Sequence, residues 1–229
     1  MSNKKILIVM TNVEKYATTN RATGLWLSEL THFYDKIHRA GYDVDFASPK
    51  GGYVPLDPHS LRFADETDWA LYHDEDFRQK ALATSLSVDT IDPSHYVAIY
   101  YTGGHGVMWD FPDNQDLQKI AESIYQNGGY VTAVCHGVVG LLNLKTENGE
   151  PLIKGRHVTG FTNTEEALNR TTKFVPFLTE TTLKSQGAQF TKRRFFSSHA
   201  VRDGRLITGQ NPQSPADVAD LLVKALEEN

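Results

Sequence analysis

The sequence contains one cysteine in 229 residues, Cys135. A single thiol excludes an internal disulfide framework and is typical of a reducing, cytoplasmic setting. No segment approaches the roughly 18 apolar residues of a membrane span. The basic amino terminus is followed by an apolar stretch too short for a secretory signal, with no small-residue cleavage site. We therefore expect a cytoplasmic protein with no membrane partner.

Basic residues are also fewer than acidic ones, 23 against 28, which gives a formal net charge of -5. The basic run at 192–194 is short and fits a solvated strand edge or dimer contact better than a nucleic-acid patch. A mildly acidic surface repels phosphate backbones, so we expect no nucleic-acid partner. The sequence has no HExxH arrangement, zinc-spaced Cys/His cluster, Walker A loop or dinucleotide fingerprint. No metal or other cofactor is expected.

Short apolar runs alternate with amphipathic helical patterns along the chain. The runs are KKILIVMT, DVDFASP, YVAIYYTGG and YVTAVCHG, with helices predicted over 22–40 and 114–127 and a last strand and helix near the carboxyl terminus. This alternation predicts an α/β fold, a single flavodoxin-like doubly wound sandwich over residues 1–229 with a mostly parallel sheet covered by helices on both faces. Residues 51–73 are rich in Gly, Pro and aromatics, and we interpret them as a small insertion.

Cys135 lies between the β-branched run YVTAV and the small-residue run HGVVGLL. The sequence therefore predicts a strand, a sharp turn and a helix, with the thiol exposed at the turn as in a nucleophile elbow. The helix amino terminus is expected to lower the pKa of the thiol and make it nucleophilic. The alternative is a buried cysteine that packs as a small hydrophobe. His136 can supply an acid/base imidazole, and its backbone amide can stabilise an oxyanion.

Two further segments carry polar groups or glycines that could serve a reaction. Glu29 lies at the margin of the apolar stripe predicted for the helix over 22–40. A carboxyl group there should have a raised pKa and could share a proton with a nearby thiol, or it could turn to solvent. Gly103 and Gly104 end another predicted strand, where missing side chains let backbone amides approach a carbonyl oxygen.

The segment VTGFTNTEEALN places Glu165 and Glu166 in the first turn of a predicted helix. Acidic residues at this position can simply favour the helix dipole. One of them could instead orient an imidazole and complete a Cys-His-carboxylate set. The sequence pattern leaves both readings open.

Together these motifs resemble the ThiJ/PfpI superfamily, which includes the Parkinsonism-associated deglycase relatives and is a branch of the class I glutamine-amidotransferase-like fold. The similarity runs over nearly the whole chain. GGHG, AVCHG and VTGFTNTEE are most similar to the branch of heat-shock chaperones and glutathione-independent glyoxalases. The resemblance implies a homodimeric, stress-protective lyase of the D-lactate dehydratase type that acts on methylglyoxal and related α-oxoaldehydes without a cofactor.

The resemblance also assigns roles to individual positions. It implies that Cys135 is the nucleophile, that His136 is its acid/base neighbour, and that Glu29 is a buried acid in contact with the thiol. The third member of the set is an acidic residue after TGFT, which falls on Glu166, with Glu165 as the competing assignment.

Two positions of the GGHG motif are implied to bind substrate. Gly104, with the amide of His136, matches the oxyanion site, and His105 is expected to line the pocket. The implied reaction begins with attack of the thiolate on the aldehyde to form a hemithioacetal. Glu29 or His136 then moves a proton between the two carbons, and water releases the 2-hydroxy acid, D-lactate in the case of methylglyoxal.

Four other functions remain open at this stage. The same elbow could serve a PfpI-like cysteine peptidase or amidase through a thioester, or a protein deglycase. A stress chaperone or a redox sensor is also compatible, because a reactive thiol oxidises readily to sulfenic or sulfinic acid. Compared with the larger chaperones of this branch the chain lacks a long extra amino-terminal segment, which argues against strong holdase activity.

Overall fold

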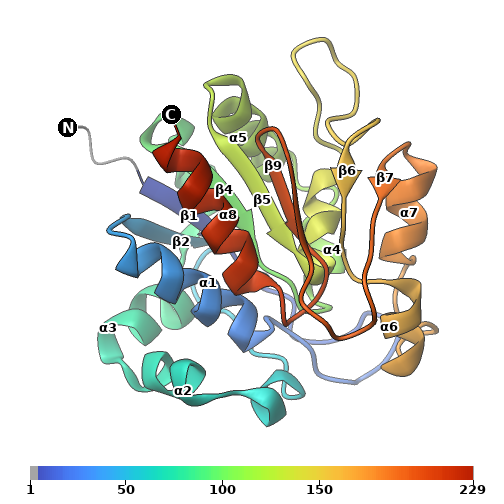
Figure 1. Ribbon diagram of the computed structural model, residues 1–229. Helices are drawn as coiled ribbons and strands as arrows, with labels where there is room; N and C mark the ends of the chain where they lie inside the picture. Colours follow the sequence, from blue (N-terminus) through green and yellow to red (C-terminus); the bar gives the residue numbers. More distant parts are fainter. Residues whose placement is uncertain (1–4, 229) are drawn as a thin grey trace.

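A computed structural model describes residues 5–228. Seven strands form one sheet in the order β3-β2-β1-β4-β5-β9-β8, in which only the β8–β9 pair is antiparallel among the described strands (Figure 1). The predicted α/β fold with a mostly parallel sheet is confirmed. The strands of this sheet are β1 (Lys5–Val9), β2 (Val44–Ser48), β3 (Leu86–Ser87), β4 (Tyr96–Tyr101), β5 (Tyr130–Val134), β8 (Ala200–Asp203) and β9 (Leu206–Gly209), and β6 (His157–Val158) and β7 (Gln189–Phe190) pair separately.

The central strands are apolar on successive residues because both of their faces are buried. In β4, Ala98 and Tyr100 belong to the core on one face of the sheet, whereas Ile99 and Tyr101 belong to the core on the other face. This alternation follows from the two-residue period of a strand. Phe33 stacks on Tyr100 with ring centroids 3.6 Å apart, which fixes the first helix on its face of the sheet.

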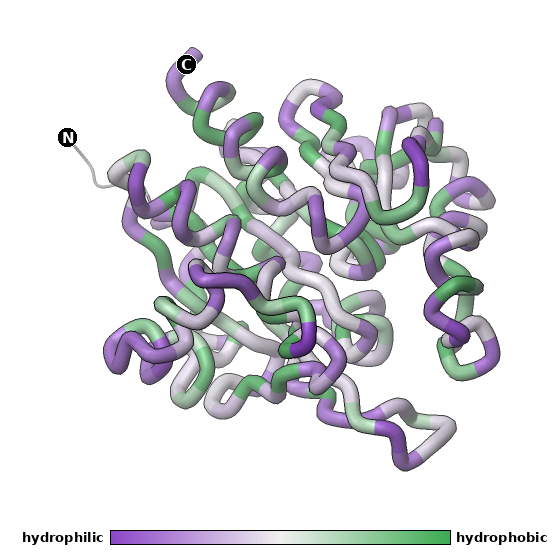
Figure 2. Tube along the Cα trace, turned by 60° about the horizontal axis from the view of Figure 1, so that its bottom comes forward, coloured by the Kyte–Doolittle hydropathy of each residue, from purple (hydrophilic) through white to green (hydrophobic). Residues whose placement is uncertain are grey.

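Helices cover both faces of the sheet. α1 and α8 lie side by side on one face and α5 covers the other (Figure 1). In Figure 2, α8 alternates between hydrophobic and hydrophilic residues, as a helix with one buried face does. The helices are α1 (Leu27–Arg39), α2 (Glu66–His73), α3 (Glu75–Phe77), α4 (Val107–Asp110), α5 (Gln115–Gln126), α6 (Asn163–Leu168), α7 (Thr179–Ser185) and α8 (Pro215–Glu227), together with a π-helical turn at Arg78–Ala83 and short 3-10 turns at Ser60–Phe63, Val88–Thr90, Pro93–His95 and Cys135–Leu141.

The first helix begins later than the sequence pattern predicts, at Leu27 rather than residue 22. Gly24 has φ +155°, and a Cβ there would lie 2.2 Å from the carbonyl oxygen of Pro55, so the chain must stay extended. The amide of Leu25 donates to Pro55 O, and the amide of Asp57 donates to Leu25 O, both at 2.8 Å. These bonds attach the start of the predicted insertion to the entrance of α1.

Several other elements were not predicted, among them α2 and β8. α2 lies inside the 51–73 segment, where Asp65 and Asp68 form a capping box at its amino end. β8 adds an antiparallel edge strand before β9. Within residues 5–228, no helix has both the length and the apolar character that crossing a membrane requires.

Candidate active site

Cys135 follows directly from β5 and begins the 3-10 helix Cys135–Leu141. Its φ is +55°, a left-handed conformation that a residue with a side chain adopts only when its surroundings enforce it. Gly137 allows the turn to close, because a Cβ at this position would lie 2.4 Å from the backbone oxygens of Tyr101 and Thr102. The strand, turn and helix expected around the thiol are therefore present.

The expected exposure and pKa of the thiol are both wrong. The residue is 3% exposed. Burial raises the pKa of the Cys135 thiol well above its ordinary value, the Glu29 carboxyl raises it further, and only the amide of His136 opposes the rise. A helix amino terminus favours the thiolate, but the loss of solvent around the sulfur disfavours it more strongly. The resting sulfur is therefore a protonated thiol that needs a base in order to attack.

Glu29 is the closest acidic partner of this thiol. Its side chain is fully buried at the start of α1, and neither carboxyl oxygen makes a well-formed hydrogen bond within the described part of the chain. Burial raises the pKa of Glu29 to about 8, against smaller opposing effects of the Cys135 thiol and the Gly103 amide. The carboxyl group is therefore largely protonated at neutral pH, and the alternative in which it turns to solvent does not occur.

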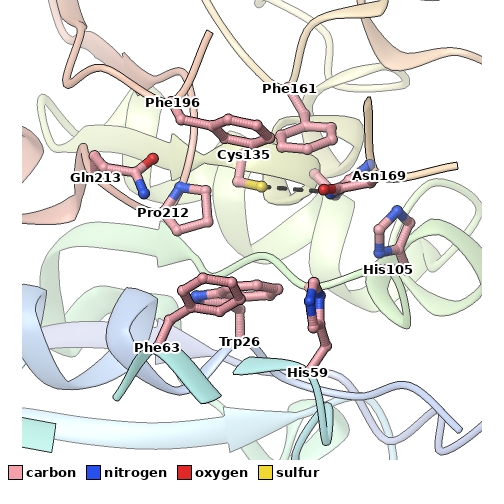
Figure 3. Close-up of a pocket in the computed structure, with 12 residues that line it drawn as sticks. Trp26, His59, Phe63, His105, Cys135, Phe161, Asn169, Phe196, Pro212 and Gln213 are labelled. Atoms are coloured by element: carbon pink, nitrogen blue, oxygen red, sulfur yellow. Dashed lines mark hydrogen bonds between the residues drawn. The ribbon is translucent and has the colours of Figure 1, made fainter. Parts of the chain in front are cut away.

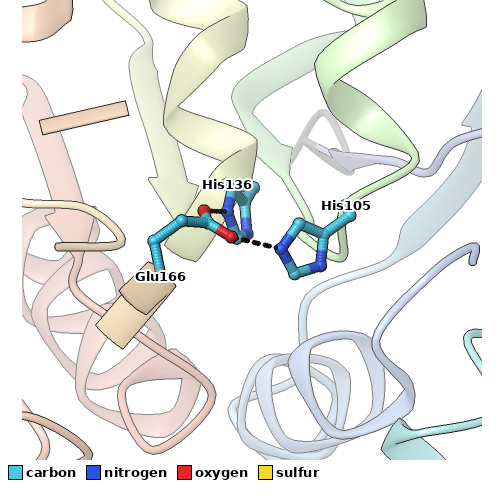
Figure 4. A group of neighbouring side chains, drawn as sticks. All are labelled: His105, His136 and Glu166. Carbon is cyan, nitrogen blue, oxygen red and sulfur yellow. Dashed lines mark hydrogen bonds and ion pairs between the residues drawn. The ribbon is translucent and has the colours of Figure 1, made fainter. Parts of the chain in front are cut away.

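His136 and His105 both donate to the carboxylate of Glu166 (Figure 4). His136 Nε2 lies 2.7 Å from Oε2, and His105 Nε2 lies 2.9 Å from Oε1. Burial alone would raise the pKa of Glu166, but the two imidazoles outweigh it and hold the pKa far below its usual range. An ionised carboxylate only accepts, so both histidines carry their proton on Nε2. His136 Nδ1 is then free to accept a proton from Cys135 Sγ, 3.5 Å away.

Glu165 lies in a different environment from Glu166. It is fully buried and accepts hydrogen bonds from the Thr162 hydroxyl, the Phe196 amide and the side chain of Asn211, at 2.7 to 2.8 Å. No bond from Glu165 to either imidazole occurs among residues 5–228. Of the two competing residues, the structure therefore brings Glu166, and not Glu165, to His136.

The glycine pair after β4 makes room for these groups. A Cβ on Gly103 would lie 2.3 Å from Glu29 Oε2 and 3.0 Å from the Cβ of Cys135, so the carboxyl and the thiol can meet only at a glycine. Gly104 has φ +95°, and a Cβ there would lie 2.1 Å from the backbone oxygen of Gly24. Gly104 and His105 both line the cavity beside the thiol.

A cavity of about 280 Å³ opens beside the thiol (Figure 3). Several of its walls were not found from the sequence, because they come from loops without a periodic pattern: His59 and Phe63 from the predicted insertion, and Phe196 from the segment between β7 and β8. The complete lining is Trp26, His59, Phe63, Gly104, His105, Cys135, His136, Phe161, Asn169, Phe196, Pro212 and Gln213. An aromatic content above that of ordinary loops was the one available sequence signal.

Within residues 5–228, two groups of side chains have the donor atoms of a metal site. His105, His136 and Glu166 place two imidazole nitrogens and a carboxylate oxygen within 4.8 Å of one another, a donor set that suits zinc. His32, Asp65 and Asp68 form a second group near the start of α2. In the first group the three side chains already satisfy one another by hydrogen bonding.

Known proteins are similar to this chain in both sequence and structure. The chain is 32% identical over 235 residues to Glyoxalase 3 of Candida albicans, covering 98% of this chain and 99% of that protein. It is 32% identical over 241 residues to the glutathione-independent glyoxalase HSP31 of Saccharomyces cerevisiae, covering 99% and 100%. The crystal structure of glyoxalase III from Candida albicans superimposes with a TM-score of 0.90 at 31% identity, covering 100% of this chain and 99% of that chain. The DJ-1/PfpI family profile matches residues 21–225, and the chain belongs to this family.

Proposed function

We propose that this protein is a glutathione-independent glyoxalase that converts methylglyoxal and related α-oxoaldehydes to 2-hydroxy acids. The observation that carries the proposal is the protonated, buried carboxyl of Glu29 beside the Cys135 thiol. The His136–Glu166 pair behind the same sulfur supplies the base. Full-length relatives named Glyoxalase 3 and glutathione-independent glyoxalase HSP31 support the same reaction.

The proposed reaction starts with the thiol proton moving to His136 Nδ1 while Cys135 Sγ attacks the aldehyde carbon. Glu29 donates its proton to the aldehyde oxygen, which gives a hemithioacetal and leaves a carboxylate. That carboxylate can remove the hydrogen from the aldehyde carbon and return it to the neighbouring carbon through an enediol. The amides of Gly104 and His136 are the proposed donors to the oxygen that develops negative charge.

The enediol collapses to a thioester of Cys135. The Glu29 carboxylate then accepts a proton from the attacking water, and the His136 imidazolium returns its proton to the sulfur, which releases the 2-hydroxy acid and restores the thiol. The aldehyde carbon is oxidised to the carboxylate level and the ketone carbon is reduced to the alcohol, so no external oxidant is required. The overall change is one α-oxoaldehyde plus one water giving one 2-hydroxy acid. This balance is the chemical reason for proposing a lyase without a cofactor.

The test is lactate formation by the purified protein from methylglyoxal in the absence of glutathione. Wild type should form lactate, and Cys135→Ala should lower kcat/KM by about 10³-fold or more because the covalent step is lost. Folding of the variant is checked by circular dichroism. Full turnover by a folded Cys135→Ala protein would show that Cys135 is not the nucleophile.

The Cys135–His136–Glu166 arrangement also fits a cysteine amidase, the second candidate function. Glu29 separates the two, since amide hydrolysis needs no transfer of hydrogen between carbons. Glu29→Gln should abolish lactate formation if the protein is a glyoxalase. Hydrolysis of a fluorogenic peptide that survives Glu29→Gln, without any lactate formation by wild type, would favour the amidase.

We further propose that the protein acts as a homodimer in a reducing, cytoplasmic compartment. The nucleophile must stay reduced to react, which favours such a compartment. Exposed apolar side chains away from the cavity, including Tyr53 at 67% and Leu168 at 51% exposure, provide area of the kind that subunits bury. Sedimentation equilibrium measures the mass, and a monomer at micromolar concentration would contradict the dimer.

A further inference from the structure

The cavity at Cys135 has aromatic walls on opposite sides (Figure 3). Phe161 and Phe196 lie beside the thiol, and Trp26 and Phe63 lie across from them. The Trp26 and Phe63 rings are stacked, with centroids 6.0 Å apart and an interplanar angle of 24°. The space between the two walls is therefore a slot bordered by rigid aromatic rings rather than by flexible aliphatic chains.

The structure holds Phe196 firmly in this wall. Its φ is +53°, an unfavourable conformation for a residue with a side chain. The Phe196 amide donates to Oε1 of the fully buried Glu165 at 2.8 Å, and Asn211 donates to the same oxygen. A strained residue fixed by a buried carboxylate is a feature that clusters at functional sites.

The cavity also lacks a permanently charged cation. Among residues 5–228, those that line it include no lysine and no arginine. The ionised group bonded to His105 and His136 is Glu166, which is negative. A phosphate or carboxylate on the substrate would lose its water here without gaining a cation.

The size of the cavity exceeds the needs of a very small substrate. One water requires only about 10–15 Å³ of such space, whereas the cavity offers about 280 Å³. Methylglyoxal, with a single methyl group beyond its two carbonyls, would leave most of the slot unfilled. A planar apolar group would occupy it and exclude the water.

We propose that the preferred substrates are uncharged α-oxoaldehydes that carry an aromatic group, of which phenylglyoxal is the simplest. This inference rests on the proposed glyoxalase function and adds its substrate class. Cys135 attacks the aldehyde carbon, the ring lies between the two aromatic walls, and the hydrogen moves from the aldehyde carbon to the ketone carbon. Phenylglyoxal plus water gives mandelate, with the aldehyde carbon oxidised and the ketone carbon reduced.

The experiment compares kcat/KM of the wild-type protein for phenylglyoxal and methylglyoxal, without glutathione, by measuring mandelate and lactate. We expect phenylglyoxal to be favoured by about tenfold or more, as filling an apolar pocket commonly gives. A ratio of one or less, with methylglyoxal turned over, would overturn the substrate class and leave the glyoxalase function standing. Turnover of neither aldehyde would overturn both.

Variants of Phe63 and Phe196 test whether the aromatic walls cause the preference for phenylglyoxal. Phe63→Leu and Phe196→Leu should each lower the ratio of phenylglyoxal to methylglyoxal by about threefold or more, because leucine keeps an apolar side chain but offers no ring face. Phe195→Leu is the matched control, since Phe195 is as exposed as its neighbour, at 42% against 40%, but does not line the cavity. Its ratio should equal that of wild type.

A binding measurement separates recognition from chemistry. Acetophenone is an uncharged aryl ketone without an aldehyde, and its binding to Cys135→Ala can be followed by ligand-detected NMR. Binding that is weakened in the double variants with Phe63→Leu or Phe196→Leu, but not with Phe195→Leu, supports the aromatic slot. Equal effects of all three phenylalanine changes, on binding or on the kinetic ratio, would overturn it.

Discussion

At the scale of single residues, the buried Glu29 serves the proposed reaction and also makes the stability of the fold depend on pH. Its pKa rises from an ordinary value near 4.5 to about 8 on folding, because burial disfavours the charge. Between these two values the folded protein binds more protons than the unfolded chain, so the free energy of unfolding falls as pH rises. Glu29→Gln removes this titration. The variant should gain stability relative to wild type between pH 5 and pH 8, by up to roughly 4 kcal/mol.

The measurement is urea unfolding at pH 5 and pH 8, with lactate formation assayed on the same samples. Glu147→Gln is the control, because Glu147 lies exposed in the loop after the elbow helix. We expect Glu29→Gln to be more stable than wild type at pH 8 and inactive. This result would show that the wild-type protein gives up stability to keep a carboxyl group that catalysis needs. An equal pH dependence in wild type and Glu29→Gln would show that Glu29 is already ionised in the folded protein.

Changing Glu165 or Glu166 to glutamine should have different effects: one variant should lose stability and the other should lose activity. Glu166→Gln lowers the basicity of His136 and should reduce kcat by about 10²–10⁴-fold. Glu165→Gln turns an amide N–H toward groups that themselves donate, such as the Phe196 amide, and should destabilise the fold by about 3 kcal/mol. Kinetics well below the unfolding temperature and urea unfolding separate the two effects. Equal losses of kcat and of stability in the two variants would contradict distinct roles for Glu165 and Glu166.

The residues of the candidate site differ in how far sequence could identify them. Cys135 and His136 are adjacent and follow a strand, so local pattern was enough to place them. Glu29 was ambiguous because its position at the margin of an apolar stripe allows burial or exposure, and only packing against Gly103 decides. The raised pKa of Cys135 could not be predicted, since it depends on burial by segments distant in sequence.

At the scale of secondary-structure elements, the turn from β5 into the elbow helix depends on Gly137. A Cβ there would lie 2.4 Å from two backbone oxygens, which cannot move without displacing β4. Gly137→Ala should therefore destabilise the protein by about 3 kcal/mol or more, or prevent folding. Gly149→Ala is the matched control: it has φ +78° but no neighbour within 4 Å, so only about 1 kcal/mol should be lost.

Urea unfolding of the two alanine variants checks this difference. If Gly137→Ala does not fold, its absence from the soluble fraction beside a soluble Gly149→Ala is the expected result. Equal stabilities would contradict the tight contact between the elbow and β4. The contact explains why the elbow tolerates a left-handed Cys135, since the surrounding backbone leaves the turn no other path.

Elements with a strong periodic pattern were predicted well and irregular ones were not. The 114–127 pattern matches α5 within a residue at each end, because its apolar positions repeat at helical spacing. β8 was missed because each of its residues is only partly buried, so AVRD gives no apolar run. The start of α1 was misplaced because the restriction at Gly24 comes from Pro55, in another segment.

At the scale of the whole molecule, the predicted insertion is joined to the rest of the fold. The buried Asp68 of α2 accepts a hydrogen bond from Thr31 of α1. Thr23 donates to Asp57 at 2.9 Å, and Phe63 stacks on Trp26. Sequence composition could mark 51–73 as irregular but could not show these attachments, because each partner lies in a different element. The attachments imply that the insertion does not unfold alone.

We therefore expect residues 51–73 to unfold together with the sheet in one cooperative transition. Trp69 of α2 reports on the insertion in a Trp26→Phe, Trp109→Phe variant, whereas far-ultraviolet circular dichroism reports on all helices and strands. Both signals should give the same urea midpoint, because unfolding of the insertion would break the buried Thr31–Asp68 and Thr23–Asp57 hydrogen bonds to the rest of the fold. A Trp69 transition at lower urea, before the circular dichroism changes, would show that the insertion is a separate unit and that the wall containing Phe63 can open independently of the catalytic elbow.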